Sequence, residues 1–320
     1  MPSFHKITGW LVAAGFLLLA ACTSSPTATA LPQAAPTTAP AVTERVLVLG
    51  DITDDPAEVI EGTQPLADYL AAHLKELGVT AGKVRIARTT EEMIRLLADG
   101  EVDLYFDSVY PATLISDAAG AQIVLRRWRY GVEAYQSVLF ASQASGITRL
   151  DQLPGHTIAM DAPYSTSGFL LPAVLLLEND LRLTGKPSYE DAVNANEVGF
   201  VFSYDDENTL QWVLNGYTDA GVTDDYNFDH AFPAEATTQL VELDRTEYVP
   251  RQLMVARGGL EPALLQAVKS VLIAMDEDEA AQVPLEAFQT TQFDEFPEGL
   301  VQATQRMREM SELVAGIPLP

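Results

Sequence analysis

The segment of this chain best suited to chemistry is Asp161–Pro172, which places Ser165, Thr166 and Ser167 directly before an expected helix. An apolar strand is expected just before it, over residues 157–160. The first N–H groups of a helix lack partners within the helix, and the helix dipole places partial positive charge there. Hydroxyl and N–H donors together could therefore hold an anion without Lys or Arg. The same residues are equally typical of a helix cap followed by a tight turn.

Acidic residues follow or precede several other expected elements. Asp107 and Ser108 come at the carboxyl end of an expected strand, where ligands lie in open α/β sheets. A carboxylate there repels an anion unless it is protonated, turned away or paired with a cation, and either residue could simply cap the next helix. The other acids in such places are Asp51, Asp54, Asp55, Asp205, Asp206, Glu207, Asp224 and Asp225. Each of these is also a common surface or turn residue in so acidic a protein.

Other reactive residue types give weaker signals. The basic run Arg126–Tyr130 could line a cleft, but surface ion pairs are the favoured interpretation because carboxylates are abundant. His73 lies on an apolar stripe, and His156 and His230 have no suitably spaced partners, so no metal site is predicted. No Gly-x-Ser-x-Gly motif is present, and catalysis, for example by a buried carboxylate acting as a base, is the least favoured function. No cofactor is expected.

These residues must be positioned by alternating strands and helices. The expected strands are 45–50, 84–87, 102–106, 157–160, 197–202 and 220–222. Of the expected helices, one begins at Pro56 and a second covers Leu66–Leu77, and the others are 91–99, 108–118, 167–179 and 207–214. This alternation predicts parallel α/β sheets covered on both faces. Extended runs at 134–141 and 252–256 separate two such units, which predicts two lobes on a double hinge. Helices near 262–275 and 298–314 are expected to return to the first lobe.

The N-terminus is typical of an export signal. Lys6 is followed by an apolar stretch over Trp10–Ala21 and then by Cys22, the single cysteine. The stretch is too short for a membrane span, which needs about 20 apolar residues. Leu-Ala-Ala-Cys resembles a bacterial lipoprotein signal, which implies that a lipid is attached to the Cys22 sulfur; the alternative is an ordinary signal peptide with a chance cysteine. The uncharged Thr, Ser, Ala and Pro residues that follow predict a flexible tether.

We therefore predict a signal peptide over 1–21, a tether over 22–43, lobe 1 over 44–136 and 250–320, and lobe 2 over 137–249. The single cysteine leaves no disulfide, so an exported chain needs a large core, which 48% hydrophobic residues allow. The net charge is −26, from 45 acidic and 19 basic residues. Nucleic acid and anionic lipid surfaces are excluded as general partners, because both reward positive charge. A local anion pocket built from N–H groups is still compatible with this charge.

The hydroxyl-rich segment also carries a family resemblance. Ser165–Leu170, with Pro172 two residues later, resembles the binding proteins of phosphonate, phosphite and phosphate importers. Three further segments resemble this family more weakly, namely Gln64–Leu70, Gly100–Leu104 and Asn208–Asp219. The resemblance covers most of residues 45–260. It implies a two-lobed type II periplasmic-binding-protein fold that closes on a small ligand, an extracytoplasmic location, and a monomer that docks on an ABC permease with its ATPase subunits.

The resemblance also implies a site. Ser165, Thr166 and Ser167 would hold the oxyanion oxygens next to Tyr164, and acids in the regions of Glu207 and Asp224 would meet the amino group of an aminoalkyl phosphonate. The opposite lobe would contribute Asp51, Thr53, Asp107 and Ser108. Asp107 departs from the family pattern, in which an aromatic or small neutral residue is usual. It therefore leaves open a sulfonate or cationic metabolite as cargo, and a ligand-presenting sensor component is a further alternative.

Overall fold

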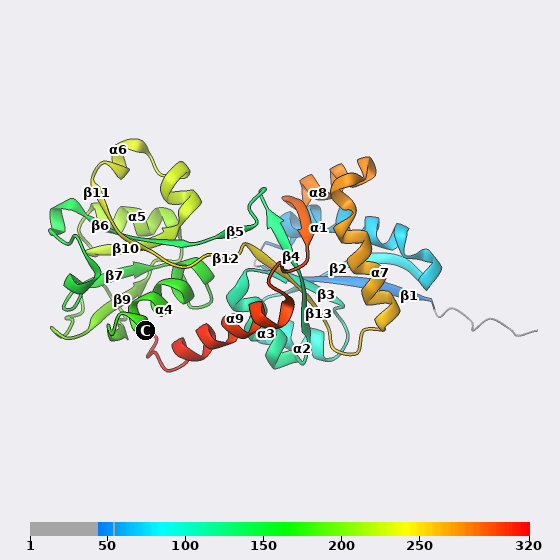
Figure 1. The fold of residues 1–320 in the computed structure, drawn as a ribbon, viewed down its shortest axis with the longest axis horizontal. Helices are drawn as coiled ribbons and strands as arrows, with labels where there is room; N and C mark the ends of the chain where they lie inside the picture. The colour runs from blue at the N-terminus through cyan, green and yellow to red at the C-terminus, as the bar shows by residue number, and fades with distance from the viewer. Residues whose placement is uncertain (1–43, 54) are drawn as a thin grey trace, which may run out of the picture. The chain divides into compact units, whose positions relative to one another are not determined.

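Two six-stranded sheets organise the chain (Figure 1). The computed structural model describes residues 44–53 and 55–320. The predicted signal peptide, Cys22, the tether and Asp54 lie outside these described residues. All described residues belong to one compact unit of the chain. Among them, no helix is both long enough and apolar enough to cross a bilayer.

The first sheet and its helices form lobe 1, with strand order β14-β4-β13-β3-β1-β2. Its strands are β1 (Arg45–Ile52), β2 (Val79–Ala87), β3 (Leu104–Asp107), β4 (Gln122–Arg129), β13 (Gln252–Ala256) and β14 (Thr290–Asp294). Its helices are α1 (Pro56–His73), α2 (Thr90–Ala98), α3 (Val109–Ala119), α7 (Pro262–Ile273) and α8 (Gln282–Ala287). The β2-β1-β3 part is parallel as predicted, whereas β13 and β14 are antiparallel to their neighbours.

The second sheet and its helices form lobe 2, with strand order β11-β6-β10-β7-β9-β8. Its strands are β6 (Ser137–Ser142), β7 (Thr157–Met160), β8 (Leu183–Gly185), β9 (Val198–Phe202), β10 (Ala220–Asp224) and β11 (Leu240–Arg245). Its helices are α4 (Leu171–Glu178), α5 (Asp206–Leu214) and α6 (Ala234–Thr237), with π-helical turns at Thr166–Leu170 and Asn227–Ala231. Here β6 pairs antiparallel with both of its neighbours, β10 and β11. Parallel pairing therefore holds for only part of each sheet, because β6 and β13 enter their sheets from the hinge and run opposite to their neighbours.

The chain passes between the lobes through β5 (Ala134–Tyr135) and β12 (Val249–Pro250), which pair antiparallel (Figure 1). These two short strands form the predicted double hinge, although only β5 lies in an expected run, because residues 252–256 form β13 of the lobe 1 sheet and β12 precedes them. Each offers only two paired residues, so the link between the sheets is narrow. A narrow two-stranded link can absorb a change of backbone angles without disturbing either sheet.

One long helix, α1, replaces the two helices expected between β1 and β2. It begins after Asp55, whose side chain accepts from the Ala57 N–H at 3.2 Å, and it continues through Pro65. Proline inside a helix removes a hydrogen bond, but the buried face around Leu66 packs on the sheet and compensates. Gly82 of β2 makes this close packing possible, because a Cβ there would lie 2.1 Å from the carbonyl oxygen of Ala67.

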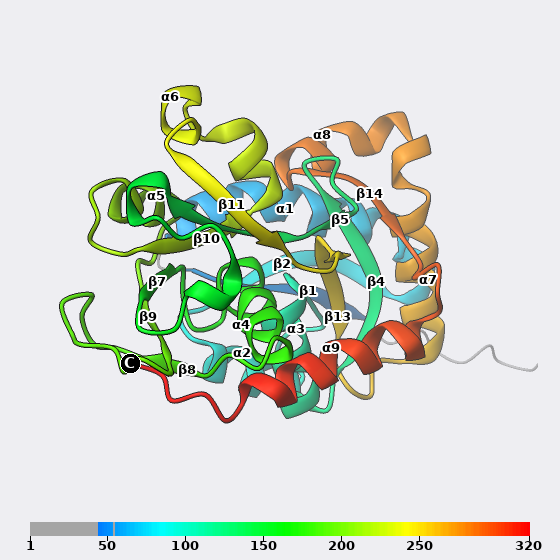
Figure 2. The same ribbon diagram turned by 60° about the vertical axis from the view of Figure 1, so that its left-hand side comes forward.

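The last helix, α9 (Leu300–Val314), contacts both lobes instead of returning to lobe 1 alone (Figure 2). Arg308 forms an ion pair with Asp117 of α3. Arg306 pairs with Glu178 of α4 at 3.0 Å and also with Glu247 beside the hinge. These partners lie more than fifty residues away in sequence, so their pairing is visible only in the tertiary structure.

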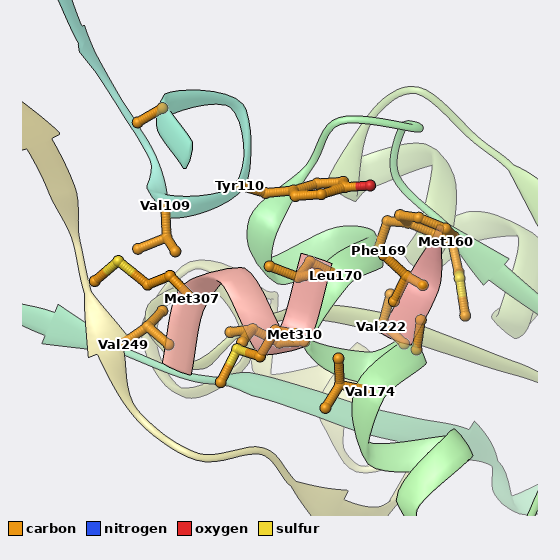
Figure 3. Packing of buried hydrophobic residues seen from close by; sticks show 14 of the residues in the cluster. Val109, Tyr110, Met160, Phe169, Leu170, Val174, Val222, Val249, Met307 and Met310 are labelled. Atoms are coloured by element: carbon orange, nitrogen blue, oxygen red, sulfur yellow. The ribbon is translucent and has the colours of Figure 1, made fainter. Parts of the chain in front are cut away.

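Apolar side chains complete this junction. Met307 and Met310 of α9 lie with Val109 of α3, Leu170 of the π-helical turn and Val249 of the hinge in one buried cluster (Figure 3). All five are buried. The lobes are therefore in contact on the side of α9, and the cluster continues into the contact between α3 and the hydroxyl-rich segment.

Candidate functional site

The hydroxyl-rich segment forms a fixed turn at the start of a helical stretch. Ser165 Oγ accepts from the Gly168 N–H at 2.9 Å, as an N-cap residue does. Gly168 leaves room for this turn, because a Cβ there would lie 2.2 Å from Cβ of Asp161. Residues 166–170 are π-helical and run directly into α4. The helix-cap interpretation of Ser165 is thus correct, and its hydroxyl acceptor capacity is used within the turn.

Thr166 joins the two lobes. It is 1% exposed, and its Oγ1 accepts from the Tyr110 N–H of α3 at 2.9 Å. The same hydroxyl donates to Ser108 Oγ at 3.0 Å. The Tyr110 ring lies across from Phe169, whose centroid is 6.3 Å away (Figure 3). The structure therefore brings Thr166 and Ser108 together, with hydrogen-bonding groups converging from both lobes.

Tyr135 of the hinge connects this contact to a cavity. Burial raises the pKa of Tyr135, while the charge of Arg251 and hydrogen bonding with Thr166 and Ser167 oppose the rise. The Arg251 guanidinium lies 4.3 Å from the Tyr135 ring centroid. Ser167 is fixed from the other side, because its carbonyl oxygen accepts from Ser137 Oγ at 2.7 Å.

The hinge cavity has a volume of about 490 Å³ and mixes aromatic, acidic and basic walls. Asp206 accepts from Thr223 Oγ1 at 2.8 Å and from Asn227 Nδ2 at 2.9 Å. Burial, together with the nearby charge of Asp224, raises the pKa of Asp206 to about 6. Arg251 lies 3.9 Å from the Asp224 carboxylate. The cavity therefore offers both a half-buried carboxylate and a guanidinium to a ligand.

A second cavity, of about 620 Å³, lies in lobe 1 at the carboxyl ends of β1 and β3. Asp51 and Asp107 line it, and neither forms an ion pair with a residue that the structure describes. Asp107 accepts from the Ser108 N–H at 2.6 Å and from the Tyr105 hydroxyl. Burial raises the pKa of Asp51 to about 6, with a contribution from Asp107, and burial also raises the pKa of Asp107. Burial outweighs the opposing charges of Arg127 and Arg129 near Asp51 and of Arg129 near Asp107, so both carboxyl groups remain biased toward the neutral form.

The basic run is not a set of surface ion pairs, which corrects the favoured interpretation of the sequence. Arg126 and Arg127 lie in β4 and are only 8% and 6% exposed. Arg126 pairs with Asp294 of β14. Arg127 donates to Thr290, Gln252 and the carbonyl oxygen of Phe288, all uncharged acceptors. Its guanidinium lies 3.6 Å over the Phe288 ring at the wall of the lobe 1 cavity. Burial lowers the pKa of Arg127, although the guanidinium stays charged.

Several residues expected in the site lie elsewhere. Glu207 is exposed and lines neither cavity, while its neighbour Asp206 does. Thr53 accepts from the Asp55 N–H at 2.9 Å and shapes the turn before α1. Tyr164 is 48% exposed and also lines neither cavity. Asp51, Asp107 and Asp224 do line cavities.

Among the hinge-cavity residues that were missing from the expected site are Tyr226, Asn227 and Arg251. Tyr226 and Asn227 lie two and three residues after β10, and Arg251 directly follows β12, so their places after strand ends were the available signal. The described residues contain no group of three or more His, Cys, Asp or Glu side chains arranged to hold a metal ion.

Two lobes on a two-stranded hinge, with cavities at the strand ends, define a type II periplasmic binding protein. The chain matches the model of a family described as "ABC transporter, phosphonate, periplasmic substrate-binding protein" over residues 52–298. It belongs to this family. The chain is therefore an extracytoplasmic substrate-binding component of an ABC transporter, a class of transport protein and not of enzymes, and the predicted family and fold are confirmed.

Several solved structures have the same fold as this chain. XAC2383 from Xanthomonas citri, bound to chloride, is 30% identical with a TM-score of 0.76, and the match covers 84% of this chain and 97% of that one. The same protein bound to ATP matches at 28% identity, again with a TM-score of 0.76, over 84% and 96% of the two chains. PhnD1 from Prochlorococcus marinus, in complex with methylphosphonate, is 16% identical with a TM-score of 0.61 over 85% and 99%, and it supports the fold alone.

Proposed function

We propose that this protein binds a phosphonate-like oxyanion, including aminoalkyl phosphonates, between its lobes and delivers it to an ABC permease. The observation that carries this proposal is the Thr166 hydroxyl, which meets the Tyr110 N–H and the Ser108 hydroxyl across the lobe contact. When the hinge opens, these groups lose their mutual hydrogen bonds. An oxyanion oxygen can then accept a hydrogen bond from the Tyr110 N–H, in place of Thr166. It can also accept from the hydroxyl groups of Thr166 and Ser108.

Closure makes this binding selective. An oxyanion held by donors from both lobes links them, whereas a ligand held by one lobe leaves the hinge free to open. Closure also excludes water, and hydrogen bonds to a charged oxygen are stronger in a site of low dielectric constant. The closed form is the state that we expect to dock on the permease.

The hinge cavity supports an ammonium group on the same ligand. Asp206 is half-buried and its pKa is raised to about 6, so its carboxylate lacks a full counter-charge. An ammonium group that approaches Asp206 and Asp224 supplies that charge and favours the ionised carboxylates. The anionic end then lies near Tyr135, which lines the same cavity, and its neighbour Thr166.

Asp206→Asn should weaken the binding of 2-aminoethylphosphonate about 10- to 100-fold, the loss expected for one charge-assisted hydrogen bond. Methylphosphonate, which has no ammonium group, should bind this variant as it binds the natural protein. Glu207→Gln is the matched control, because this neighbouring acid is exposed and lines neither cavity. Titration calorimetry measures all the affinities. Equal losses for both ligands would mean that Asp206 does not meet the ammonium group.

The acidic cavities favour a cationic metabolite as the second candidate cargo, and a sulfonate is the third. A thermal-shift screen of the purified chain with phosphate, phosphite, methylphosphonate, 2-aminoethylphosphonate, taurine and alkylammonium ions separates these classes. Ligand at about 100 times its dissociation constant adds roughly 2.7 kcal/mol of stability. Shifts with phosphorus oxyanions support the proposal, and shifts with cations or taurine alone would replace it.

We also propose that the protein is a lipoprotein anchored through Cys22, which the sequence places directly after Leu-Ala-Ala. Cys22→Ser removes the sulfur that would carry the lipid. In a bacterial expression host we expect the natural protein in the membrane fraction and the variant in the soluble extracytoplasmic fraction. A variant that stays in the membrane fraction would refute lipidation at Cys22.

A further inference from the structure

The two cavities meet at shared residues and together exceed what a small phosphonate needs. Arg129 and Tyr130 line both the lobe 1 cavity of about 620 Å³ and the hinge cavity of about 490 Å³. Each volume alone lies within the range of about 300–1,000 Å³ typical of pockets for drug-sized ligands. A phosphonate with one or two carbon atoms would fill only a small part of either one.

A strained pair of residues holds the Tyr130 ring at this junction. Tyr130 and Gln289 have φ values of 55° and 52°, in the left-handed region that side-chain-bearing residues seldom adopt. Tyr130 N–H donates to the Gln289 carbonyl oxygen at 2.9 Å. The Tyr130 hydroxyl donates to Gln289 Oε1 at 2.7 Å, and Arg129 donates to the same atom at 2.9 Å. Such strain persists where surrounding contacts enforce it, and it gathers at ligand sites.

The enforced conformation leaves an aromatic face available. Tyr130 is 60% exposed although it is held by these hydrogen bonds, and the Arg129 guanidinium lies 5.0 Å from its ring centroid. Across the hinge cavity Tyr226 is 57% exposed and stacks on His230 at 5.1 Å. Rigid, exposed aromatic rings on the walls of a cavity are suited to a planar ligand group.

The lobe 1 cavity beyond Tyr130 offers four carboxyl groups as hydrogen-bond acceptors. Asp51 and Asp107 are its half-buried carboxyl groups, Glu58 and Glu61 add two exposed ones, and Phe288 gives an aromatic wall beneath Arg127. A group that donates N–H bonds would satisfy the half-buried acceptors. A polyphosphate would be repelled there, because these four acids outnumber the two arginines of the lining.

We propose that the ligand is a phosphonate or phosphate monoester whose planar, N–H-donating substituent passes Tyr130 into the lobe 1 cavity, and that stacking on Tyr130 selects it. The proposal rests on the proposed function, since the phosphorus oxyanion still lies at the contact between Thr166 and Tyr110. Tyr130 is then the specificity-determining residue, and the oxyanion contacts are common to all ligands of the class.

Titration calorimetry on the purified full chain tests this with AMP, adenosine, methylphosphonate and 2-aminoethylphosphonate as probes. AMP should bind more tightly than either small phosphonate. Tyr130→Ala should lower the affinity for AMP by roughly tenfold, as expected for loss of one stacked ring. The affinity for methylphosphonate should not change. Tyr130→Phe keeps the ring and should retain most of the AMP affinity.

Tyr204→Ala is the matched control, because Tyr204 is also strained, with φ 60°, and is 70% exposed, but it lines neither cavity. It should not change AMP binding. Small phosphonates that bind as tightly as AMP, or a Tyr130→Ala variant with unchanged AMP affinity, would overturn the inference and leave the proposed function standing. Adenosine binding as tightly as AMP, or no binding of any phosphorus oxyanion, would instead overturn the proposed function.

Discussion

Replacing Thr166 with valine will lower the affinity of this protein for every phosphorus oxyanion ligand by about 10- to 100-fold. Valine has nearly the same shape but cannot hydrogen-bond, so the variant loses a buried donor that we place on the oxyanion. Loss of one hydrogen bond to a charged ligand typically costs about 1.5–3 kcal/mol, which corresponds to this change in dissociation constant. Titration calorimetry with methylphosphonate and with the best ligand of the screen measures the effect.

Thr113→Val is the matched control for this experiment. Thr113 is also 1% exposed, but its hydroxyl donates to the Val109 carbonyl oxygen within α3 and does not face lobe 2. It should lower stability modestly without changing affinity. If Thr166→Val and Thr113→Val have the same affinity as the natural protein, the lobe contact at Thr166 is structural and the oxyanion lies elsewhere.

Asp51→Asn will make the unliganded protein more stable at neutral pH, by roughly 1–3 kcal/mol. Burial raises the pKa of Asp51 from 3.8 to about 6 in the folded state. The folded state therefore binds the proton more tightly than the unfolded chain does. This contribution to stability is fully present below pH 3.8 and is lost as pH rises through 6. Above pH 6 the ionised carboxylate is a cost, and asparagine, which cannot ionise, removes it.

Urea unfolding at pH 7.5 and pH 4 measures this effect through the difference between the variant and the natural protein. The variant should be more stable at pH 7.5, and the difference should shrink at pH 4. Glu61→Gln is the control from the same cavity, since Glu61 is exposed and its charge is solvated. A variant no more stable than the natural protein at pH 7.5 would show that Asp51 already has a compensating partner. A stabilising substitution at this position would also identify Asp51 as a residue kept for ligand binding at the expense of stability.

The broad architecture was predictable because its signals are local. Apolar runs such as Arg45–Gly50 coincide with β1, and the helices near 262–275 and 298–314 match α7 and α9 within a few residues. The two extended runs between α/β units predicted a double hinge, and its strands β5 and β12 lie in or next to those runs. Short-range periodicity reports which faces are buried, so it is sufficient for element type and for the repeat of strand and helix.

Local signals failed where burial depends on distant partners. Three arginines and a tryptophan gave no indication of a strand, yet β4 buries Arg126 and Arg127 against Asp294, Thr290 and Gln252. Each of those partners is more than one hundred residues away in sequence. A charged side chain is buried only when such partners are present, and the chain topology decides whether they are.

The candidate site divides in the same way. The sequence by itself determined the hydroxyl-rich turn, its position before a helix, the family, and the acids at the strand ends. Only the tertiary structure decided that Thr166 meets Tyr110 across the lobes and that Asp206, not Glu207, lines the hinge cavity. Neighbouring residues at a helix start point in different directions, and only the packing of that helix determines which of them faces the ligand. The same is true of Tyr130, whose strained backbone is held in place by Gln289, a residue 159 positions away in the sequence.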